Sequence, residues 1–350
     1  MPRLHLRRTS RLAAISLPVA LALTGVAASA GTASAAPAPK ATDTVNVVGY
    51  SIVAGAYAAL ETAFKATPAG AKVSFTNSFG PSTTQADDVV AGQPADVVNF
   101  STAPDLELLV TNGLVSPKWA TTGAGATERG MVTDSYVVLV TKPGNPEGIT
   151  GWPSLTKAGV QVVTPDPISS GSARWNLLAV YESQIIAKKT AKQAKAFTNS
   201  VVKNVVAEPT SGSKSLAAFL AGTGNVLLAY EADALTAKAA GKAINVVYPA
   251  QNTLIQTPAA LTSSGTSNPG AKAFFKFLFS PAGQNIWAHN NFRPTLPSVA
   301  KSDASLFAHK YAAKNVTTIA SLKGWDAVTF KFFSPNGIIT DIEKAHGWTS

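Results

Sequence analysis

Short apolar runs alternate with segments of helical periodicity along most of the chain. The run VNVVGY at 45–50 precedes a helical pattern that reaches about Ala66, and ADVVNF at 95–100 precedes another that Gly113 closes. Repeated strand–helix units predict the α/β class, with a mostly parallel sheet flanked by helices. A long strand near Ser135 leads into a second series, whose strands are VQVV and NVLLAY.

The order of these elements predicts two lobes joined by crossover strands near Ser135 and Ala250. Lobe I would then consist of 45–135 and 250–350, and lobe II of 136–249. The segment after the second crossover is mainly helical in pattern, and we expect its helices to pack back on lobe I. Ligands bind such sheets beyond the carboxyl ends of the strands, where helices begin.

The first 35 residues have the composition of a secretory signal peptide. Arg3, Arg7, Arg8 and Arg11 precede an apolar stretch at 12–28, and the small-residue sequence ASA follows at 28–30 and again at 33–35. This order predicts a signal peptide at 1–35 and a flexible leader at 36–44. A retained membrane anchor is the alternative, against which Pro18 and the short, alanine-rich core argue. We expect export to the periplasm or the outer face of the cell; the export route is left open.

The charge and the cysteine content of the chain argue against a nucleic-acid binder, a disulfide-bonded protein and a lipoprotein. The 29 basic and 19 acidic residues give a net charge of +10, which falls to +6 once the four N-terminal arginines are removed. The remaining positive charge comes mostly from scattered lysines, which does not suit a nucleic-acid binder. The chain has no cysteine, so it forms no disulfide and carries no cysteine-linked lipid anchor.

Four strand-to-helix turns are rich in serine, threonine and glycine: 49–51, 80–83, 169–172 and 210–215. Such turns present backbone N–H groups and hydroxyls at the positive end of a helix dipole, which suits an anion. Ordinary helix capping explains each turn equally well when it is taken singly. Four of them along one rim favour anion capture.

Motifs for catalysis are weak. Only His289, His309 and His346 follow the signal segment, and no HExxH, G-x-S-x-G, P-loop or G-x-G-x-x-G pattern occurs. Three Ser-x-x-Lys pairs, at 154–157, 211–214 and 298–301, leave a secreted serine hydrolase as an alternative. An adhesion or scaffold protein is a further one. We expect no metal, no cofactor and no enzymatic activity.

The turn at 169–172 belongs to a longer motif that resembles a known family. TPDPISSGSARWNLLA at 164–179 is similar to the NPKSSGGARWN signature of bacterial sulfate-binding proteins, the receptors of sulfate/thiosulfate ABC importers. VVGYS, SFGPSTTQADDVVAGQPADVV, FSPAGQ and FRP match other family segments in the same order. The resemblance implies a periplasmic-binding-protein type II fold and a monomeric receptor that passes sulfate or thiosulfate to the permease subunits.

The resemblance also implies which residues bind the anion. The family holds dehydrated sulfate through neutral donors and helix N-termini, and the matching positions here are Ser51, Ser82, Ser170, Gly171, Ser172, Gly212, Ser213 and Tyr230. Tyr230 stands in place of the family's tryptophan and Ser172 in place of a glycine, so molybdate or another tetrahedral oxyanion stays open as the ligand. Arg174 is expected to hold a neighbouring carbonyl or carboxylate rather than the anion. Trp175 starts a core-facing stripe on the same helix.

Overall fold

The computed structural model describes residues 43–348, and three parallel strands form the edge of its sheet. They are β1 (Asp43–Tyr50), β2 (Val73–Gly80) and β3 (Val97–Asn99), and β1 pairs with both of the others. Helices α1 (Ala54–Lys65), α2 (Ser82–Val90) and α3 (Ala103–Thr111) follow them in turn. Val45, Val47 and Val48 of β1 are all buried, because helices cover both faces of this part of the sheet.

The second lobe repeats this arrangement. Its parallel strands are β5 (Val162–Val163), β6 (Val205–Ala207) and β7 (Val226–Tyr230). The short strand β8 (Asn245–Val247) pairs antiparallel with β4 (Met131–Thr141). Its helices are α4 (Gly171–Ile186), α5 (Ala191–Val202), α6 (Gly212–Leu220) and α7 (Glu231–Ala239). The predicted core-facing stripe of α4 consists of Trp175, Leu178, Tyr181 and Ile185; the first three are fully buried and Ile185 is half-buried.

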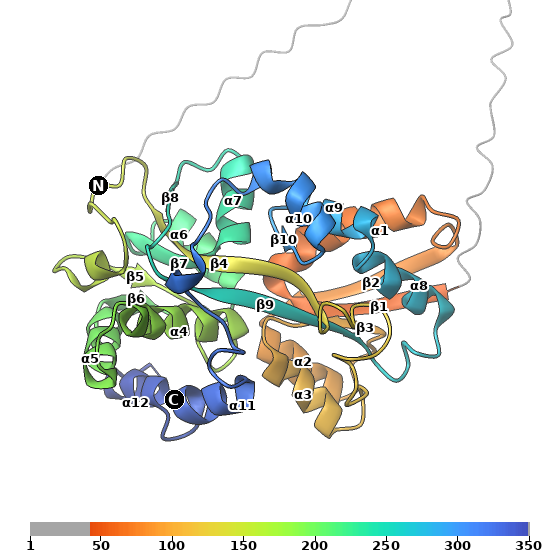
Figure 1. Ribbon diagram of the computed structural model, residues 1–350, viewed down its shortest axis with the longest axis horizontal. Coiled ribbons are helices and arrows are strands. Elements are labelled where there is room, and N and C mark those ends of the chain that lie inside the picture. The colour runs from red at the N-terminus through yellow and green to blue at the C-terminus, as the bar shows by residue number, and fades with distance from the viewer. Residues whose placement is uncertain (1–42, 349–350) are drawn as a thin grey trace, which may run out of the picture. The chain divides into compact units, whose positions relative to one another are not determined.

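Two long strands join the lobes, β4 (Met131–Thr141) and β9 (Asn252–Leu261), and Figure 1 shows them running from one half of the sheet into the other. The strand order is β2-β1-β3-β9-β4-β7-β5-β6. The partner of β4 changes in mid-strand, since Tyr136 pairs with Leu254 of β9 whereas Val137 pairs with Tyr230 of β7. At this change the Asn252 side chain donates to the Val137 carbonyl at 2.7 Å and accepts from its N–H at 3.3 Å. The amide thus replaces the missing ladder bonds.

The final helices divide between the two lobes. They are α8 (Pro269–Leu278), α9 (Pro281–His289), α10 (Pro297–Ser302), α11 (Trp325–Val328) and α12 (Ile338–Ala345), with short strands β10 (Arg293–Pro294) and β11 (Val316–Thr317) between them. Phe274 of α8 and Trp287 of α9 pack on Tyr57 of α1, in lobe I.

Helix α12 instead lies against α5 of lobe II, where Asp341 forms an ion pair with Lys195 at 3.5 Å. The prediction that all the final helices pack on lobe I is therefore wrong for α12. Its apolar stripe, with Ile339 and Ile342 buried, requires a partner, but a stripe does not specify which surface covers it.

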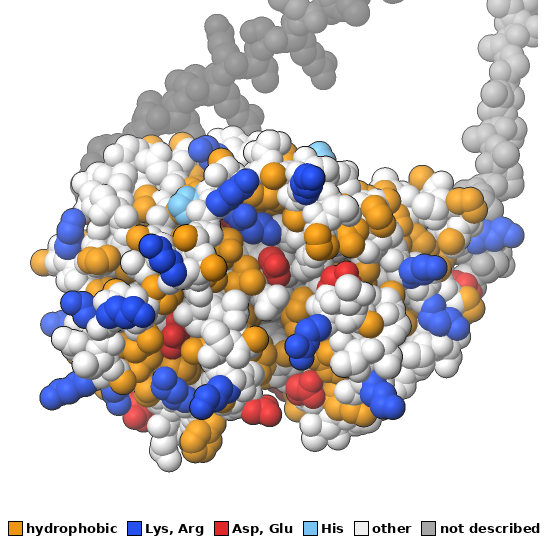
Figure 2. All heavy atoms as spheres, in the orientation of Figure 1, with side chains coloured by type: hydrophobic (Ala, Val, Ile, Leu, Met, Phe, Trp, Pro, Cys, Tyr) orange, Lys and Arg blue, Asp and Glu red, His pale blue; other side chains and the backbone are white. Residues whose placement is uncertain are grey.

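The predicted signal peptide and most of the predicted leader lie outside the described residues. Within 43–348, no helix combines the length and apolar character needed to cross a bilayer. Figure 2 shows lysine and arginine side chains spread over the visible face rather than gathered into one patch.

Candidate functional site

Helix N-termini from both lobes meet at the predicted site. Ser51 opens a 3₁₀ turn (Ser51–Val53) that continues into α1, while Gly212 is the first residue of α6. A Cβ placed on Gly212 would lie 2.7 Å from Cδ1 of Ile52 and 3.1 Å from Oγ of Ser172. The turns at 51, 172 and 212 therefore lie side by side, one from lobe I and two from lobe II.

Gly171, the first residue of α4, faces lobe I directly. A Cβ at this position would lie 2.8 Å from Cβ of Ser101 and 2.9 Å from Cγ2 of Thr102. The N–H of Thr83, in the first turn of α2, donates to the Ser169 carbonyl at 3.1 Å. The lobes are thus in contact along the rim where the helices begin.

The serines at 170 and 172 do not behave as ordinary helix caps. Ser170 occupies the N-cap of α4, yet its side chain makes no capping bond, and its Oγ lies 2.8 Å from Oγ of Ser172. Ser211, at the equivalent position of α6, does cap its helix by accepting from the Lys214 N–H at 3.2 Å. The loop before α4 is held by Asp166, which accepts from the Ser169 hydroxyl at 2.7 Å. The Ala173 N–H donates back to the Ser170 carbonyl at 3.1 Å, whereas the N–H groups of Gly171 and Ser172, the first two residues of α4, have no intrahelical partner and remain donors.

Ser82 uses its hydroxyl within lobe I. The side chain is 2 % exposed and donates to Asp105 Oδ2 at 2.7 Å, while its oxygen accepts from the Ser101 N–H at 2.9 Å. Because an ionised carboxylate only accepts, the hydroxyl proton of Ser82 is committed to Asp105. What Ser82 can offer an anion is its backbone N–H in the first turn of α2. Ser213 is half-buried in the first turn of α6, next to Gly212.

Tyr230 reaches across to lobe I at the end of β7. Its hydroxyl lies 2.7 Å from Oγ of Ser101, and the side chain is 1 % exposed. Burial, together with the neighbouring Tyr50, raises the pKa of Tyr230 above its ordinary value, so the hydroxyl stays neutral and keeps its proton. Trp175 donates from Nε1 to the Ser101 carbonyl at 2.8 Å.

Ser101 and Asp105 were missed by the sequence reasoning. Ser101 follows β3 in the sequence NFSTAPD, so the same signal of hydroxyl residues after a strand was available there. Asp105 lies in the first turn of α3 and accepts from Thr83 at 2.9 Å and from Thr102 at 2.9 Å, as well as from Ser82. Its burial in a network of hydroxyls cannot be read from its position in a helix.

Arg174 contacts both a carbonyl and a carboxylate. Its Nε donates to the Pro167 carbonyl at 3.1 Å, and its Nη1 lies 3.8 Å from Oδ1 of Asp105. The hydrogen bond to Pro167 holds the loop before α4 in place, and the ion pair with Asp105 connects α4 to the first turn of α3 in lobe I.

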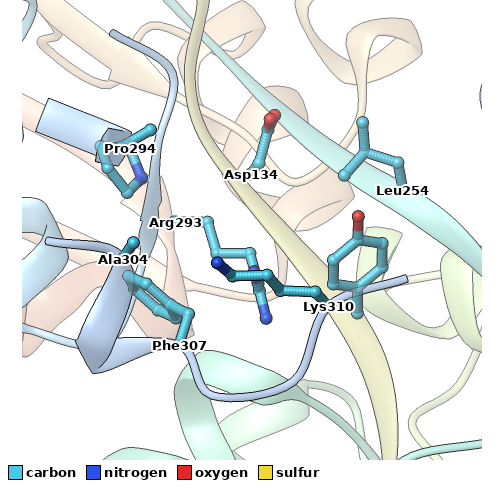
Figure 3. Close-up of a pocket in the computed structure, with 9 residues that line it drawn as sticks. Asp134, Leu254, Arg293, Pro294, Ala304, Phe307 and Lys310 are labelled. Carbon is cyan, nitrogen blue, oxygen red and sulfur yellow. The ribbon is translucent and has the colours of Figure 1, made fainter. Parts of the chain in front are cut away.

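A cavity of about 250 Å³ lies away from these turns, beside β4 and β10, and Figure 3 shows side chains that line it. Its Arg293 guanidinium is occupied by Glu231, at 2.6 Å and 2.8 Å, and burial raises the pKa of its Asp134 to about 7. A buried carboxyl group beside a neutralised arginine does not favour an anion, so this cavity is not the predicted site.

Catalytic alternatives find little support in the described residues. Lys157 Nζ donates to the Gly148 carbonyl and Lys214 Nζ to the Thr210 hydroxyl, so neither ammonium group activates the serine of its Ser-x-x-Lys pair. His309 stacks on Tyr248 with ring centroids 4.3 Å apart. Over residues 43–348, no group of three or more histidine, cysteine, aspartate or glutamate residues is placed to hold a metal ion.

Two lobes that meet through donor-rich helix N-termini define a two-lobed periplasmic-type binding protein of the type II fold. Residues 45–293 match the bacterial extracellular solute-binding proteins, and the chain belongs to this family. The sulfate-binding protein of Synechococcus elongatus is 34% identical over 308 residues, which cover 86% of this chain and 87% of that protein.

Two further relatives are also named as sulfate- or thiosulfate-binding proteins. The thiosulfate-binding protein of Pseudomonas aeruginosa is 30% identical and covers 78% of this chain and 83% of its own. The structure of the sulfate-binding protein SubI from Mycobacterium tuberculosis H37Rv superposes with a TM-score of 0.78 at 35% identity, covering 83% of this chain and 100% of that chain. The predicted membership of the sulfate- and thiosulfate-binding proteins is confirmed.

Proposed function

We propose that this protein is an extracytoplasmic receptor that binds sulfate, or thiosulfate, between its lobes. The observation that carries the proposal is that helix N-termini of both lobes lie together, with Gly171 beside Ser101, Gly212 beside Ile52 and Ser172, and the Tyr230 hydroxyl on that of Ser101. Sulfate has no proton near neutral pH, so a site composed of donors matches it. The names of the relatives support the same ligand.

The anion-binding groups would be backbone N–H groups at the helix starts together with a few hydroxyls. We assign these roles to Ser51, Ser82, Ser170, Gly171, Ser172, Gly212, Ser213 and Tyr230. Arg174 would act indirectly, through its contacts with Pro167 and Asp105, by holding the loop before α4. A neutral site avoids the cost of burying a cationic side chain together with its ligand.

The lobes would move about the two joining strands. We place the boundaries at the partner change of β4, between Tyr136 and Val137, and at the start of β9 near Ala250. Lobe II would additionally include α12, because that helix packs on α5. The contact between Gly171 and Ser101 would belong to the closed arrangement of the lobes and would be lost on opening, as in a hinge-type binding protein.

The biological role that follows is delivery of the anion to an ABC permease by an exported, monomeric receptor without a lipid anchor. The protein would have no catalytic activity and no cofactor. In two of the three Ser-x-x-Lys pairs the lysine ammonium group donates to a group other than the serine, which argues against a serine hydrolase at those two pairs. Stoichiometric labelling of the native protein by a covalent serine probe would favour the hydrolase alternative instead.

Titration calorimetry of the mature protein tests the ligand. We expect sulfate to bind with micromolar or tighter affinity, with thiosulfate competing. Binding of molybdate in the absence of sulfate binding would reject the proposal. Ser170→Asp places a negative charge beside the anion, so it should abolish sulfate binding while leaving the thermal unfolding transition in place. Retention of sub-micromolar affinity in this variant would show that the loop at 169–172 does not bind the anion.

A further inference from the structure

Ser101 occupies the centre of the contact between the lobes. Its N–H donates to Ser82 at 2.9 Å, its carbonyl accepts from Trp175 at 2.8 Å, and its hydroxyl lies 2.7 Å from that of Tyr230. A Cβ on Gly171 would approach the Ser101 Oγ to 3.0 Å, so this hydroxyl lies beside the N-terminus of α4. Both backbone groups of Ser101 are therefore occupied, and only the hydroxyl pair is available to a ligand.

The hydroxyl pair can both donate and accept. Ser101 and Tyr230 have one proton each, and their mutual hydrogen bond uses one of the two. The second proton is left for a ligand oxygen, and lone pairs remain on both oxygens. An indole N–H at the position of Tyr230 would offer a donor only. The Ser101–Tyr230 pair thus gives this site a hydrogen-bond acceptor, which a site with an indole at position 230 would lack.

Asp105 is the other acceptor close to the site, but its oxygens are already used. The hydroxyls of Ser82, Thr83 and Thr102 all donate to this carboxylate, and Arg174 lies 3.8 Å away. The O–H group of a protonated ligand would therefore donate its hydrogen bond to a hydroxyl oxygen of the Ser101–Tyr230 pair rather than to the Asp105 carboxylate.

We propose that the Ser101–Tyr230 hydroxyl pair lets this site bind singly protonated tetrahedral oxyanions, with hydrogen phosphate as the simplest probe, in addition to fully ionised sulfate. The proposal rests on the proposed function, because it assumes that the anion binds where the two lobes meet. A site of donors alone rejects a protonated anion since the ligand's O–H is left without a partner on burial, and the hydroxyl pair removes that penalty. Ser101 is then a residue that determines specificity.

Competition calorimetry at pH 7 with sulfate and inorganic phosphate tests the proposal on the mature protein. We expect phosphate to bind the wild type within about fivefold of sulfate, because the unpaired O–H group in a donor-only site would weaken phosphate binding by about 5- to 150-fold. Ser101→Ala should raise the ratio of the phosphate dissociation constant to the sulfate dissociation constant about tenfold or more. Ser200→Ala, on α5 with its hydroxyl on the Ala196 carbonyl, is the matched control and should leave the ratio unchanged.

Each other outcome has a defined meaning. Tight sulfate binding with no phosphate binding in the wild type overturns the hydroxyl-pair proposal, and this measurement does not depend on any variant folding. An unchanged ratio in Ser101→Ala overturns it as well, and a change confined to Ser172→Ala would assign the acceptor to the Ser170–Ser172 pair instead. Phosphate binding without sulfate binding would reject the proposed function but keep the acceptor at Ser101 and Tyr230.

Discussion

Replacing Gly171 by alanine tests whether the lobes close on the start of α4. The glycine backbone has a conformation that any residue adopts, so an alanine fits the helix, but its methyl group would lie 2.8 Å from Cβ of Ser101 and 2.9 Å from Cγ2 of Thr102. Ordinary carbon contacts are about 3.5–4.0 Å, so the lobes would have to separate by about 1 Å. Such overpacking costs about 1–3 kcal/mol and should weaken sulfate binding by about 5- to 150-fold.

The same variant should not lower the stability of the protein. Alanine is better than glycine in a helix by up to about 1 kcal/mol, and an open arrangement of the lobes relieves the clash. Gly55→Ala is the matched control, because it also lies in the first turn of a helix and its new methyl would meet nothing within 4 Å. Titration calorimetry and thermal unfolding of the three proteins measure the two effects. Equal sulfate affinity in Gly171→Ala and Gly55→Ala would refute closure of the lobes at this point.

Three further predictions concern other contacts. Gly212→Ala should weaken sulfate binding less than Gly171→Ala in the same titration, because its nearest new contact is the movable end of a side chain. Glu231→Gln leaves the Arg293 charge buried with a weaker partner, and we expect urea denaturation to show a free energy of unfolding lower by about 3 kcal/mol. Burial raises the pKa of both Glu208 and Glu343 above the ordinary 4.5, so the folded protein holds protons that the unfolded chain has released. Its free energy of unfolding should therefore fall as the pH rises from about 5 to about 9, and Glu343→Gln should flatten this slope in denaturation at a series of pH values.

Much of the fold was predictable because its signals are local. Strand and helix positions follow from the spacing of apolar residues, and β1, α1 and β7 lie within a few residues of the expected ranges. The start of α4 at Gly171 was likewise marked by the hydroxyl residues before it. Such patterns predict secondary structure because the conformation of a short segment depends largely on the residues within that segment.

Contacts between distant segments were not predictable in this way. Ser101 and Tyr230 are 129 positions apart, and nothing near either of them indicates that their hydroxyls meet. The partner of the Ser82 hydroxyl, Asp105, is in another helix. The amide of Asn252 substitutes for ladder bonds only because two strands diverge beside it.

The sequence by itself determined the order of strands and helices, the family, and the serine and glycine turns that begin α2, α4 and α6. Tertiary structure alone decided which of these hydroxyls are free. Ser82 donates its proton to a carboxylate, Ser170 leaves its helix uncapped, and Ser101 joins the site from the turn that follows β3. The physical reason is that a hydroxyl group has one proton and donates one hydrogen bond at a time. Which acceptor receives that bond depends on which group the fold brings within about 3 Å.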